Sequence, residues 1–411
     1  MANTSILVVG GGFSGLTAAL EAAEVGHEVF IVEKNPFLGG RVAQLNKYFP
    51  KLCPPSCGLE IQFQRVKNNP LVKVLTMAEV TGVSGGPGNY EVSVSIKPRH
   101  VGPGAADLSG DAAALSASVP SEFELGMGTR KALYMDMPFA FPHRYVLDKA
   151  NLTENEAKAL AANEAIDLAE QEKSITLNVG AIIYATGWKP YDMTNLTNLG
   201  AGMVPNVVSN MQLERLAAPS GPTKGRIVRP TDGAAPKRVA FVQCAGSRDE
   251  NHLNYCSYIC CMASLKQAAY IREQMPETDV VIYYIDLRTP GRYENFKQRI
   301  LADEKIKTVK GKVAKIEASG GNVKVTVEDA VTGLKGEDVF DMVVLATGMQ
   351  PTLAGAPLPK GVEVDQDGFL VNGEEKGIFA AGCAKLPLDV MKSAQSATGA
   401  ALKAIQTVRG R

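Results

Sequence analysis

Four of the chain's seven cysteines lie in one short stretch, where their spacing suits metal or redox chemistry. They are Cys244, Cys256, Cys260 and Cys261, in the pattern C-x11-C-x3-C-C. Iron–sulfur clusters take four sulfur ligands from a protein. Because Cys260 and Cys261 are neighbours, their side chains point in different directions and can bind one cluster at two corners. The spacing therefore predicts that these four thiolates hold an iron–sulfur cluster.

Three other interpretations of these thiols stay open. Free cysteines are often buried in apolar cores, although four of them so close together is unusual for that role. Cys256 and Cys260 can form a redox pair, although C-x-x-C is the more usual spacing. Zinc also accepts four thiolates.

The elements that must position the thiols favour a redox centre as well. A strand-like run over 238–243 leads into them, and a helix-like run over 262–275 leads out. In a doubly wound domain the turn between such elements carries a G-x-G-x-x-G loop that binds the pyrophosphate of a nicotinamide cofactor. Those glycines are missing here and thiols occupy the turn. We therefore expect this turn to serve a metal cluster or a redox thiol rather than NAD(P)H.

The beginning of the chain carries the glycine loop that the cysteine turn lacks. A buried-strand run is followed by Gly10, Gly12 and Gly15 and by an alanine-rich helical run, and the next strand ends in Glu33. This is a complete βαβ fingerprint for a dinucleotide. The glycines let the backbone approach a pyrophosphate, the helix N-terminus supplies N–H donors, and Glu33 would accept hydrogen bonds from a ribose.

Later motifs favour FAD over NAD. The segment 34–41 continues the flavoprotein pattern of a glutamate followed by Gly-Gly-Arg, and two later strands end in Ala-Thr-Gly at 185–187 and 346–348. The segment 377–383 precedes a helix-like run over 388–408. The residues that we expect to bind FAD are Gly10, Gly12, Phe13, Ser14, Gly15, Glu33, Lys34, Gly40, Arg41, Val42, Ala185, Thr186, Gly187, Thr347, Gly348, Gly382 and Cys383.

Together the motifs resemble the α/β architecture of thioredoxin reductase-like flavoproteins, which has two dinucleotide-binding (Rossmann-like) domains. The resemblance implies that both ends of the chain build the FAD domain and that the second domain is inserted. A stretch rich in proline and glycine, 217–237, is expected to be the linker between them. The predicted segments are 1–97 (FAD domain, first part), 98–173 (insertion), 174–216 (FAD domain, continued), 217–345 (second domain, with the cysteine motif) and 346–411 (FAD domain, C-terminal part).

Two further segments have several possible roles. In the insertion, Thr153 and Glu156 form a capping-box pattern for a helix reaching about Glu172, and 139–145 is aromatic and basic. The insertion is either a surface elaboration or a partner-docking surface. Cys53 and Cys57 lie on a proline-stiffened turn, where they can ligate a cluster, form a redox disulfide or simply pack. Farther on, apolar and polar residues alternate in the segments 311–318 and 322–328, which predicts two antiparallel strands.

Composition excludes several classes of function. Basic and acidic residues balance, 43 against 43, so the chain carries no electrostatic footprint for nucleic acid or an anionic membrane surface. We expect no signal peptide and no membrane span. An odd number of clustered cysteines is unlike a secreted disulfide framework, so we expect a reducing cytoplasm.

On these motifs the chain resembles the flavoprotein A subunit of heterodisulfide reductases. It is most similar to the shorter version found in the quinone-interacting membrane-bound oxidoreductase complex of sulfate reducers. The resemblance covers nearly the whole chain and is most specific at 244–249, 256–261, 286–288 and Gly382–Cys383. The long relatives carry C-x2-C-x2-C runs that this sequence lacks, so electrons would leave through a partner. At the third FAD motif, flavoproteins usually have Gly-Asp, whereas this sequence has Gly382–Cys383. The replacement of the aspartate by a cysteine puts one hydrogen bond to the cofactor in question.

The resemblance implies a cubane [4Fe–4S] cluster on Cys244, Cys256, Cys260 and Cys261, and a catalytic Lys266 beside the flavin N5. A cation there would stabilise a reduced, anionic flavin; the alternative is a solvated helix charge. The implied complex contains a second subunit, which carries flavin and iron–sulfur groups, plus a membrane subunit. It would assemble as a dimer of heteromers, peripherally attached to the cytoplasmic face of the inner membrane. It would link the menaquinone pool to adenylylsulfate reductase.

Two rival functions remain. The first is an NAD(P)H-dependent thiol-disulfide reductase that uses Cys256 with Cys260 or Cys53 with Cys57. The missing second glycine loop argues against it. The second is a structural hub that binds FAD mainly in order to fold and that docks redox subunits.

Overall fold

The computed structural model describes residues 3–103, 107–116, 118–359 and 361–410. They form two compact units. Unit 1 comprises Met1–Ala43, Ser56–Trp188 and Pro351–Arg411, and unit 2 comprises Gln44–Pro55 and Lys189–Gln350. The first and the last segments of the chain therefore belong to the same unit.

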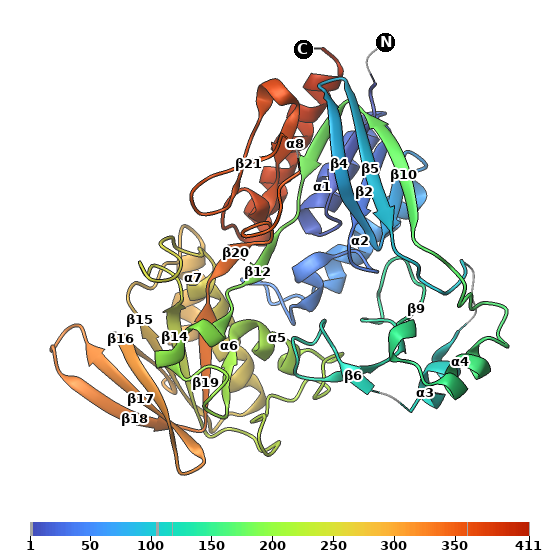
Figure 1. Ribbon diagram of the computed structural model, residues 1–411. Helices are drawn as coiled ribbons and strands as arrows, with labels where there is room; N and C mark the ends of the chain where they lie inside the picture. The colour runs from blue at the N-terminus through green and yellow to red at the C-terminus, as the bar shows by residue number, and fades with distance from the viewer. Residues whose placement is uncertain (1–2, 104–106, 117, 360, 411) are drawn as a thin grey trace. The chain divides into compact units, whose positions relative to one another are not determined.

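Unit 1 is built around a parallel sheet in the order β23-β11-β1-β2-β3. Its strands are β23 (Ile378–Ala380), β11 (Ala181–Tyr184), β1 (Ile6–Val9), β2 (Val29–Glu33) and β3 (Val72–Thr76). Helices α1 (Phe13–Glu24), α2 (Ser56–Asn68) and α8 (Val390–Val408) pack on it, with α1 against both α2 and α8 (Figure 1).

The opposite face of this sheet carries an antiparallel sheet of β10 (Lys173–Val179), β5 (Asn89–Ile96) and β4 (Ala78–Gly86). Alternate side chains of β1 face the two layers. Ile6 and Val8 belong to the helical core, whereas Leu7 packs with Val92 and Leu177. This period of two is what a strand covered on both faces requires.

The insertion lies between β5 and β10 and has a small apolar core of its own. The capping box at Thr153 is confirmed, but α4 (Glu154–Leu160) ends well before Glu172. The Asn163 side chain accepts a hydrogen bond from the N–H of Ala165 at 3.0 Å, and such local bonds compete with a continuing helix. The remaining elements are α3 (Ser109–Ala114) and the strand pairs β6 (Ser118–Pro120) with β7 (Thr129–Lys131) and β8 (Leu133–Tyr134) with β9 (Val146–Leu147).

The aromatic segment of the insertion packs against other parts of unit 1 and is not a free surface. Phe141 stacks on Phe63 of α2, with ring centroids 5.4 Å apart, and its carbonyl accepts the N–H of Leu38 at 2.7 Å. Phe139 also packs against the helical core. This segment therefore supports the loop that leads to Gly40.

Unit 2 is built around a seven-stranded sheet in the order β13-β19-β14-β15-β16-β17-β18. Its strands are β13 (Val207–Ser209), β19 (Met342–Thr347), β14 (Arg238–Ala245), β15 (Asp279–Tyr284), β16 (Ile306–Ser319), β17 (Asn322–Asp329) and β18 (Lys335–Phe340), and its helices are α5 (Asn210–Ala217), α6 (Cys260–Gln274) and α7 (Tyr293–Leu301). The predicted antiparallel pair is confirmed as β16 with β17. The start of β16 extends farther back than expected, because it first pairs in parallel with β15.

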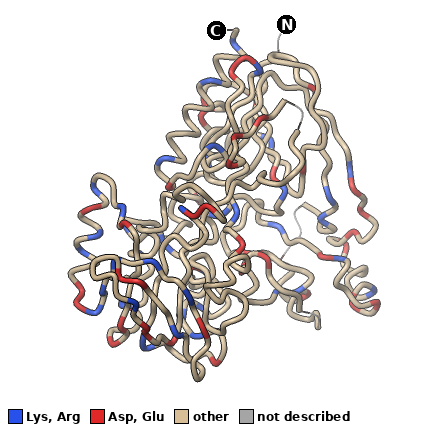
Figure 2. The backbone as a smooth tube through the Cα atoms, turned by 60° about the vertical axis from the view of Figure 1, so that its left-hand side comes forward, with Lys and Arg blue, Asp and Glu red and all other residues tan. Residues whose placement is uncertain are grey.

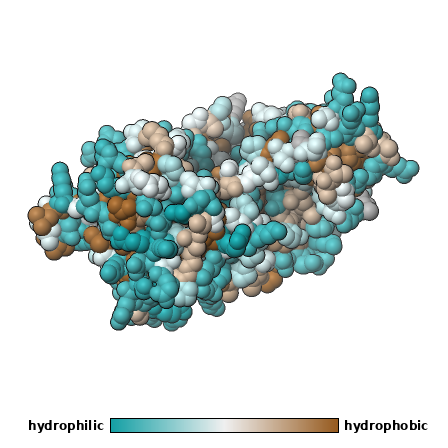
Figure 3. Space-filling model, turned by 90° about the horizontal axis from the view of Figure 1, so that it is seen from below, coloured by the Kyte–Doolittle hydropathy of each residue, from teal (hydrophilic) through white to brown (hydrophobic). Residues whose placement is uncertain are grey.

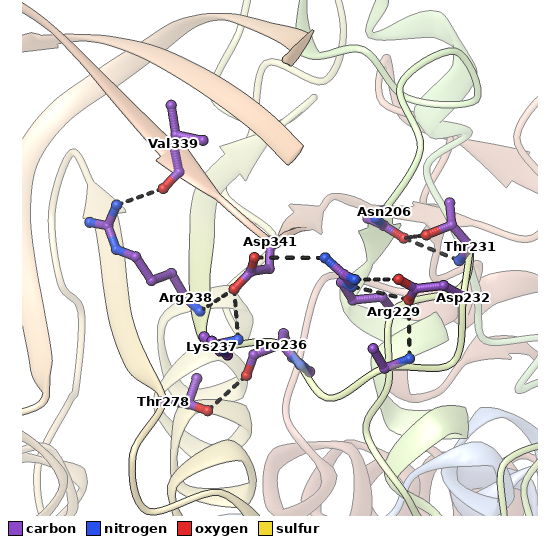
Figure 4. A network of polar contacts seen from close by, with 11 residues as sticks. Asn206, Arg229, Thr231, Asp232, Pro236, Lys237, Arg238, Thr278, Val339 and Asp341 are labelled. Atoms are coloured by element: carbon purple, nitrogen blue, oxygen red, sulfur yellow. Dashed lines mark hydrogen bonds and ion pairs between the residues drawn. The ribbon is translucent and has the colours of Figure 1, made fainter. Parts of the chain in front are cut away.

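The boundary between the units differs from the sequence prediction. Residues 189–216, assigned to the FAD domain, lie in unit 2, because β13 pairs with β19 and α5 packs on α6. The expected linker 217–237 is likewise part of unit 2. It is tied down by bonds of Asn206 to Thr231, and by the Asp341 carboxylate, which accepts the N–H groups of Lys237 and Arg238 at 2.7 Å (Figure 4).

Charged residues of both signs are interleaved along the backbone, in keeping with the balanced composition (Figure 2). On the face shown in Figure 3, hydrophilic residues prevail and hydrophobic ones form small scattered groups. Among the described helices, none has the combination of length and apolar composition that a membrane span requires.

Candidate functional site

The turn between β1 and α1 can be built only with glycines at two positions. Gly10 has φ +106°, and a Cβ atom on it would lie 2.4 Å from the carbonyl oxygen of Ala185. A Cβ on Gly15 would lie 1.8 Å from the carbonyl oxygen of Gly10. No side chain fits at such distances, so the first turn of α1 packs directly on the loop.

A second glycine pair closes the loop from the other side. The N–H of Gly39 donates to the carbonyl of Gly11 at 2.9 Å, and a Cβ on Gly40 would lie 2.9 Å from the Cα of Gly12. Gly12 is the N-cap of α1 and has no side chain to occupy the first N–H groups of the helix. The bare helix start suits a pyrophosphate.

Glu33 holds this loop together. Its carboxylate accepts the N–H of Gly11 at 2.6 Å and both the N–H and the side-chain amide of Asn35 at 2.8 and 2.7 Å. Burial raises the pKa of Glu33, and these hydrogen bonds oppose that rise. The expected contact with a ribose would therefore be made by a carboxylate that also fixes the loop.

Most other residues expected to bind FAD surround the same turn. Gly187 has φ +68°, and a Cβ on Gly382 would lie 2.1 Å from the hydroxyl of Ser14. The guanidinium of Arg41 donates to the carbonyl of Trp188 at 3.3 Å. Unit 1 also contains Phe13, Lys34, Val42, Ala185 and Thr186.

Cys383 has a structural environment of its own. Its thiol is buried, donates to the carbonyl of Leu388 at 3.4 Å and lies 3.7 Å from the hydroxyl of Ser393. Burial raises the pKa of this thiol. The thiol therefore stays neutral and helps to position the start of α8.

Thr347 and Gly348 belong to unit 2, whereas the other residues expected to bind FAD belong to unit 1. The Thr347 hydroxyl donates to Asn210 at 3.2 Å, and a Cβ on Gly348 would lie 2.7 Å from Leu253. The sequence grouped these residues with the glycine loop because they repeat the Ala-Thr-Gly of 185–187. In the structure they end β19, the strand beside the cysteine turn.

The cysteine turn begins with an irregularity in β14. The pairing of β14 with β19 shifts register between Val242 and Ala245, and Cys244 within that bulge has φ +56°. Bulges of this kind re-aim a side chain, often next to a functional site. Arg248 and Tyr258 also adopt left-handed backbone, with φ +55° and +66°. Each such residue costs about 1–3 kcal/mol and persists only where its surroundings impose it.

The other three thiols are held by backbone groups. The Cys256 sulfur accepts the N–H of Tyr258 at 3.4 Å, and the Cys261 thiol donates to the carbonyl of Asp286 at 3.3 Å. Cys260, the first residue of α6, lies 3.9 Å from the carbonyl of Thr347. The strand β14, the helix α6 and the ends of β15 and β19 therefore all meet around these sulfurs.

Burial and mutual repulsion raise the pKa values of the Cys244, Cys260 and Cys261 thiols. Burial is the main cause at Cys260, followed by the charges of Cys244, Cys261 and Cys256, which shows that the four sulfurs lie within electrostatic reach of one another. The pKa of Cys261 rises to about 11, mainly through burial. A bound cation would reverse this balance, because metal binding takes up thiolates and releases their protons.

The donor set fits an iron–sulfur cluster in number and type, since it consists of four thiols on one connection. Among the described residues, no three His, Cys, Asp or Glu side chains converge closely enough to hold a single metal ion. A four-iron cluster instead needs one thiolate at each of four separate corners. Two charged residues beside the thiols, Arg248 and Asp286, were not assigned a role from the sequence, although both lie within the motifs that carry the resemblance.

Lys266 is not a solvated helix charge. It is 2% exposed and pairs with the carboxylate of Glu214 at 3.0 Å. It also donates to the carbonyl of Lys47 at 2.7 Å, and Glu214 accepts the N–H of Asn46 at 2.9 Å. Lys266 and Glu214 thus hold the segment Gln44–Pro55, which follows the Gly40 loop in the chain. Sequence reasoning missed Glu214, whose position on a short, otherwise amphipathic helix gave no signal.

Cys53 and Cys57 fall on either side of a unit boundary. Cys53 lies in the segment Gln44–Pro55 of unit 2, where its carbonyl accepts the N–H of Tyr48 at 2.7 Å. Cys57 is exposed in the first turn of α2, in unit 1. All seven cysteines are free thiols.

Comparison with known proteins finds a family model at the glycine loop and relatives along most of the chain. A family described as FAD dependent oxidoreductase matches residues 5–49, which contain the glycine loop and Glu33. In Methanopyrus kandleri, the second iron-sulfur A subunit of CoB–CoM heterodisulfide reductase is 38% identical over 415 residues, covering 97% of this chain and 63% of that protein. The iron-sulfur A subunit of the same enzyme in Methanocaldococcus jannaschii is 39% identical over 421 residues, with the same coverage of 97% and 63%. The chain thus spans a little under two thirds of the length of these curated relatives.

Solved structures confirm the predicted fold. Thioredoxin reductase of Lactococcus lactis superposes with a TM-score of 0.54 at 14% identity, covering 99% of this chain and all of that one. Thioredoxin reductase of T. acidophilum superposes with a TM-score of 0.53 at 15% identity, covering 99% of this chain and 97% of that one. At such identities the likeness shows the fold alone: that of a thioredoxin reductase-like FAD oxidoreductase.

Proposed function

Because this chain is a homologue of the flavoprotein A subunit of heterodisulfide reductases, we propose that it is an FAD-dependent electron-transfer subunit of a larger redox complex. We further propose that Cys244, Cys256, Cys260 and Cys261 hold a [4Fe–4S] cluster. FAD exchanges two electrons and an iron–sulfur cluster one at a time, so the two groups together convert between pair and single-electron transfer. The glycine loop, Glu33 and Gly382 of unit 1 bind the nucleotide.

The observation that carries this proposal is the β14–α6 connection. It occupies the place of a second nucleotide loop, yet it lacks the G-x-G-x-x-G glycines and contains four free thiols. A strained Cys244 in a bulge and two adjacent cysteines at a helix start are arrangements that direct side chains, not ones that make room for a pyrophosphate.

Lys266 is proposed as the catalytic cation of this protein. Buried and paired with Glu214, it is held in place on α6, within two turns of Cys260 and Cys261. A positive charge at that position would stabilise a reduced, anionic flavin. Glu214 positions the ammonium group.

The finer proposal concerns the complex. The complex would transfer electrons between the menaquinone pool and adenylylsulfate reductase in dissimilatory sulfate reduction. Besides this chain it would contain a second subunit, which carries flavin and iron–sulfur groups, and a membrane subunit. The chain would then be peripheral to the cytoplasmic face of the inner membrane and part of a dimer of heteromers. Support comes from the motifs at 244–249, 256–261 and 286–288. Reduction of the flavin by a menaquinol analogue in the assembled complex, and not in the isolated chain, would support it.

The first experiment is anaerobic purification with assays of iron, acid-labile sulfide and FAD. We expect about four irons and four sulfides per FAD. Cys260→Ser removes a ligand and should lower the iron content sharply, whereas Cys383→Ser changes a buried thiol of unit 1 and should leave it unchanged. A full flavin complement without iron in the oxygen-free wild-type protein would refute the proposal.

A further inference from the structure

Two arginines of unit 2 share one carboxylate beside the cysteine turn. The Asp286 carboxylate pairs with the guanidinium of Arg248 at 2.9 Å and with that of Arg288 at 3.3 Å. Arg248 lies on the β14–α6 connection, whereas Asp286 and Arg288 follow β15. The carboxylate therefore joins two connections at the same end of the parallel sheet.

The same three residues touch the first and the last cysteine of the quartet. The Arg248 guanidinium hydrogen-bonds to the Cys244 thiol. Cys261 donates to the carbonyl of Asp286 at 3.3 Å and is also hydrogen-bonded by the backbone of Arg288. Each end of the quartet is thus fixed by this group, which reaches Cys244 through a side chain and Cys261 through backbone.

We propose that Arg248, Asp286 and Arg288 form a charged clamp that positions Cys244 and Cys261 and raises the reduction potential of the bound cluster. This inference rests on the cluster proposed above. The three are positioning residues, because they act on the cluster through its thiolate ligands. Outer-shell partners of this kind orient ligands, and the charge and hydrogen bonds around the sulfurs set the potential.

The sign of the effect follows from the charges. Reduction adds negative charge to a centre already surrounded by four thiolates, so a nearby guanidinium favours the reduced state. The Asp286 carboxylate opposes this, and the clamp has one net positive charge. The side chain of Arg248 is 24% exposed and that of Arg288 is 50% exposed. Solvent therefore screens Arg288 more, and Arg248 should have the larger effect.

The test compares Arg248→Gln, Arg288→Gln and Asp286→Asn with the wild-type protein. Arg272→Gln is the matched control, because Arg272 on α6 pairs with Asp303 at 2.7 Å and none of its hydrogen bonds involves a cysteine. Each anaerobic protein is assayed for iron and sulfide per FAD. The cluster potential is measured by redox titration followed by electron paramagnetic resonance, and the flavin potential serves as an internal reference.

We expect Arg248→Gln to shift the cluster potential to more negative values and Arg288→Gln to shift it less in the same direction. Asp286→Asn should shift it to more positive values, and Arg272→Gln should not move it. Arg248→Lys keeps the charge without the planar guanidinium, so its potential should lie closer to that of the wild type than that of Arg248→Gln does.

Opposite shifts on removing a positive and a negative charge cannot come from a merely structural support. Full iron content with unchanged potentials in Arg248→Gln and Asp286→Asn would overturn the clamp while leaving the cluster itself intact. Loss of iron in both, with wild-type iron in Arg272→Gln, would reduce the clamp to a scaffold and overturn its role in the potential. Absence of iron from the wild-type protein would overturn the proposed function first.

Discussion

The buried pair of Lys266 and Glu214 offers a quantitative test of how unit 2 is held together. Replacing Lys266 by Met removes one partner and leaves the Glu214 carboxylate, whose side chain is 1% exposed, without its cation. Breaking a buried pair in this way typically costs about 3–5 kcal/mol. Glu214 would still accept hydrogen bonds from the N–H of Asn46 and the side chain of Gln267, which places the expected loss at the lower end of that range.

At roughly 2–4 °C per kcal/mol for a domain of about 150–250 residues, unit 2 should melt about 6–12 °C lower. The double variant Lys266→Met/Glu214→Gln removes both charges and should recover part of the loss, since the uncompensated charge causes it. Lys47→Met is the control: its pair with Glu273 is exposed, so its removal should cost less than about 1 kcal/mol.

Thermal unfolding followed by circular dichroism and by flavin fluorescence measures these changes. A melting temperature of Lys266→Met equal to that of Lys47→Met would refute the reasoning. So would a double variant less stable than either single variant. An unchanged flavin potential in a folded Lys266→Gln protein would separately reject the proposed catalytic role of Lys266.

Four further predictions follow from other parts of the chain. Gly15→Ala should abolish FAD retention, because its Cβ would meet the carbonyl of Gly10, whereas Gly399→Ala in α8 meets nothing and should leave the flavin content unchanged; flavin-to-protein ratios decide this. Arg99→Met leaves the carbonyl of Arg144 and the hydroxyl of Thr76 without their hydrogen-bond donor and should destabilise the insertion by about 1–3 kcal/mol. Proteolysis within the insertion should therefore be faster than in the control Arg65→Met, which removes only an exposed ion pair with Glu24. Hydrogen bonds from Thr153 and Ser116 lower the pKa of Glu156 from its ordinary 4.5 to about 2. The Glu156 carboxylate therefore stabilises α4 fully above pH 4.5, and this stabilisation is lost as the pH falls toward 2. Hydrogen exchange of α4 should show this loss in acid in the wild type and not in Glu156→Gln. NADPH should not bleach the flavin of the isolated protein, and rapid bleaching would favour a thiol-disulfide reductase.

The sequence predicted the architecture well, because each element that it identified has a local signal. The β1–α1–β2 unit is fixed by glycines that no side chain can replace and by a carboxylate at the end of the second strand. The strand and helix on either side of the cysteines are apolar runs with clear ends. Such features depend on near neighbours in the chain, so their position can be read from the sequence.

The misplaced features depend on distant partners. Residues 189–216 follow the FAD-domain strand without a break, and the pairing of β13 with β19 and the packing of α5 on α6 assign them to unit 2. Gln44–Pro55 lies within the sequence of unit 1, yet it is bound by Glu214, Arg215 and Lys266 of unit 2. No periodicity of the segment itself reveals those partners. The helix expected to reach Glu172 is an exception, because the bond that helps to end it, from the N–H of Ala165 to the Asn163 side chain, is local.

The two doubly wound units use the same connection in opposite ways. In unit 1 the turn after β1 works through the absence of side chains, so glycine spacing predicts it. In unit 2 the turn after β14 works through side chains whose direction is set by a bulge and by left-handed residues at Cys244, Arg248 and Tyr258. The cysteine spacing therefore predicts which thiols form the donor set, but it does not predict the residues that position them. At about 1–3 kcal/mol for each strained residue, this turn stays formed only if other contacts oppose the strain, and the bonds among Arg248, Asp286 and Cys261 are placed to do so.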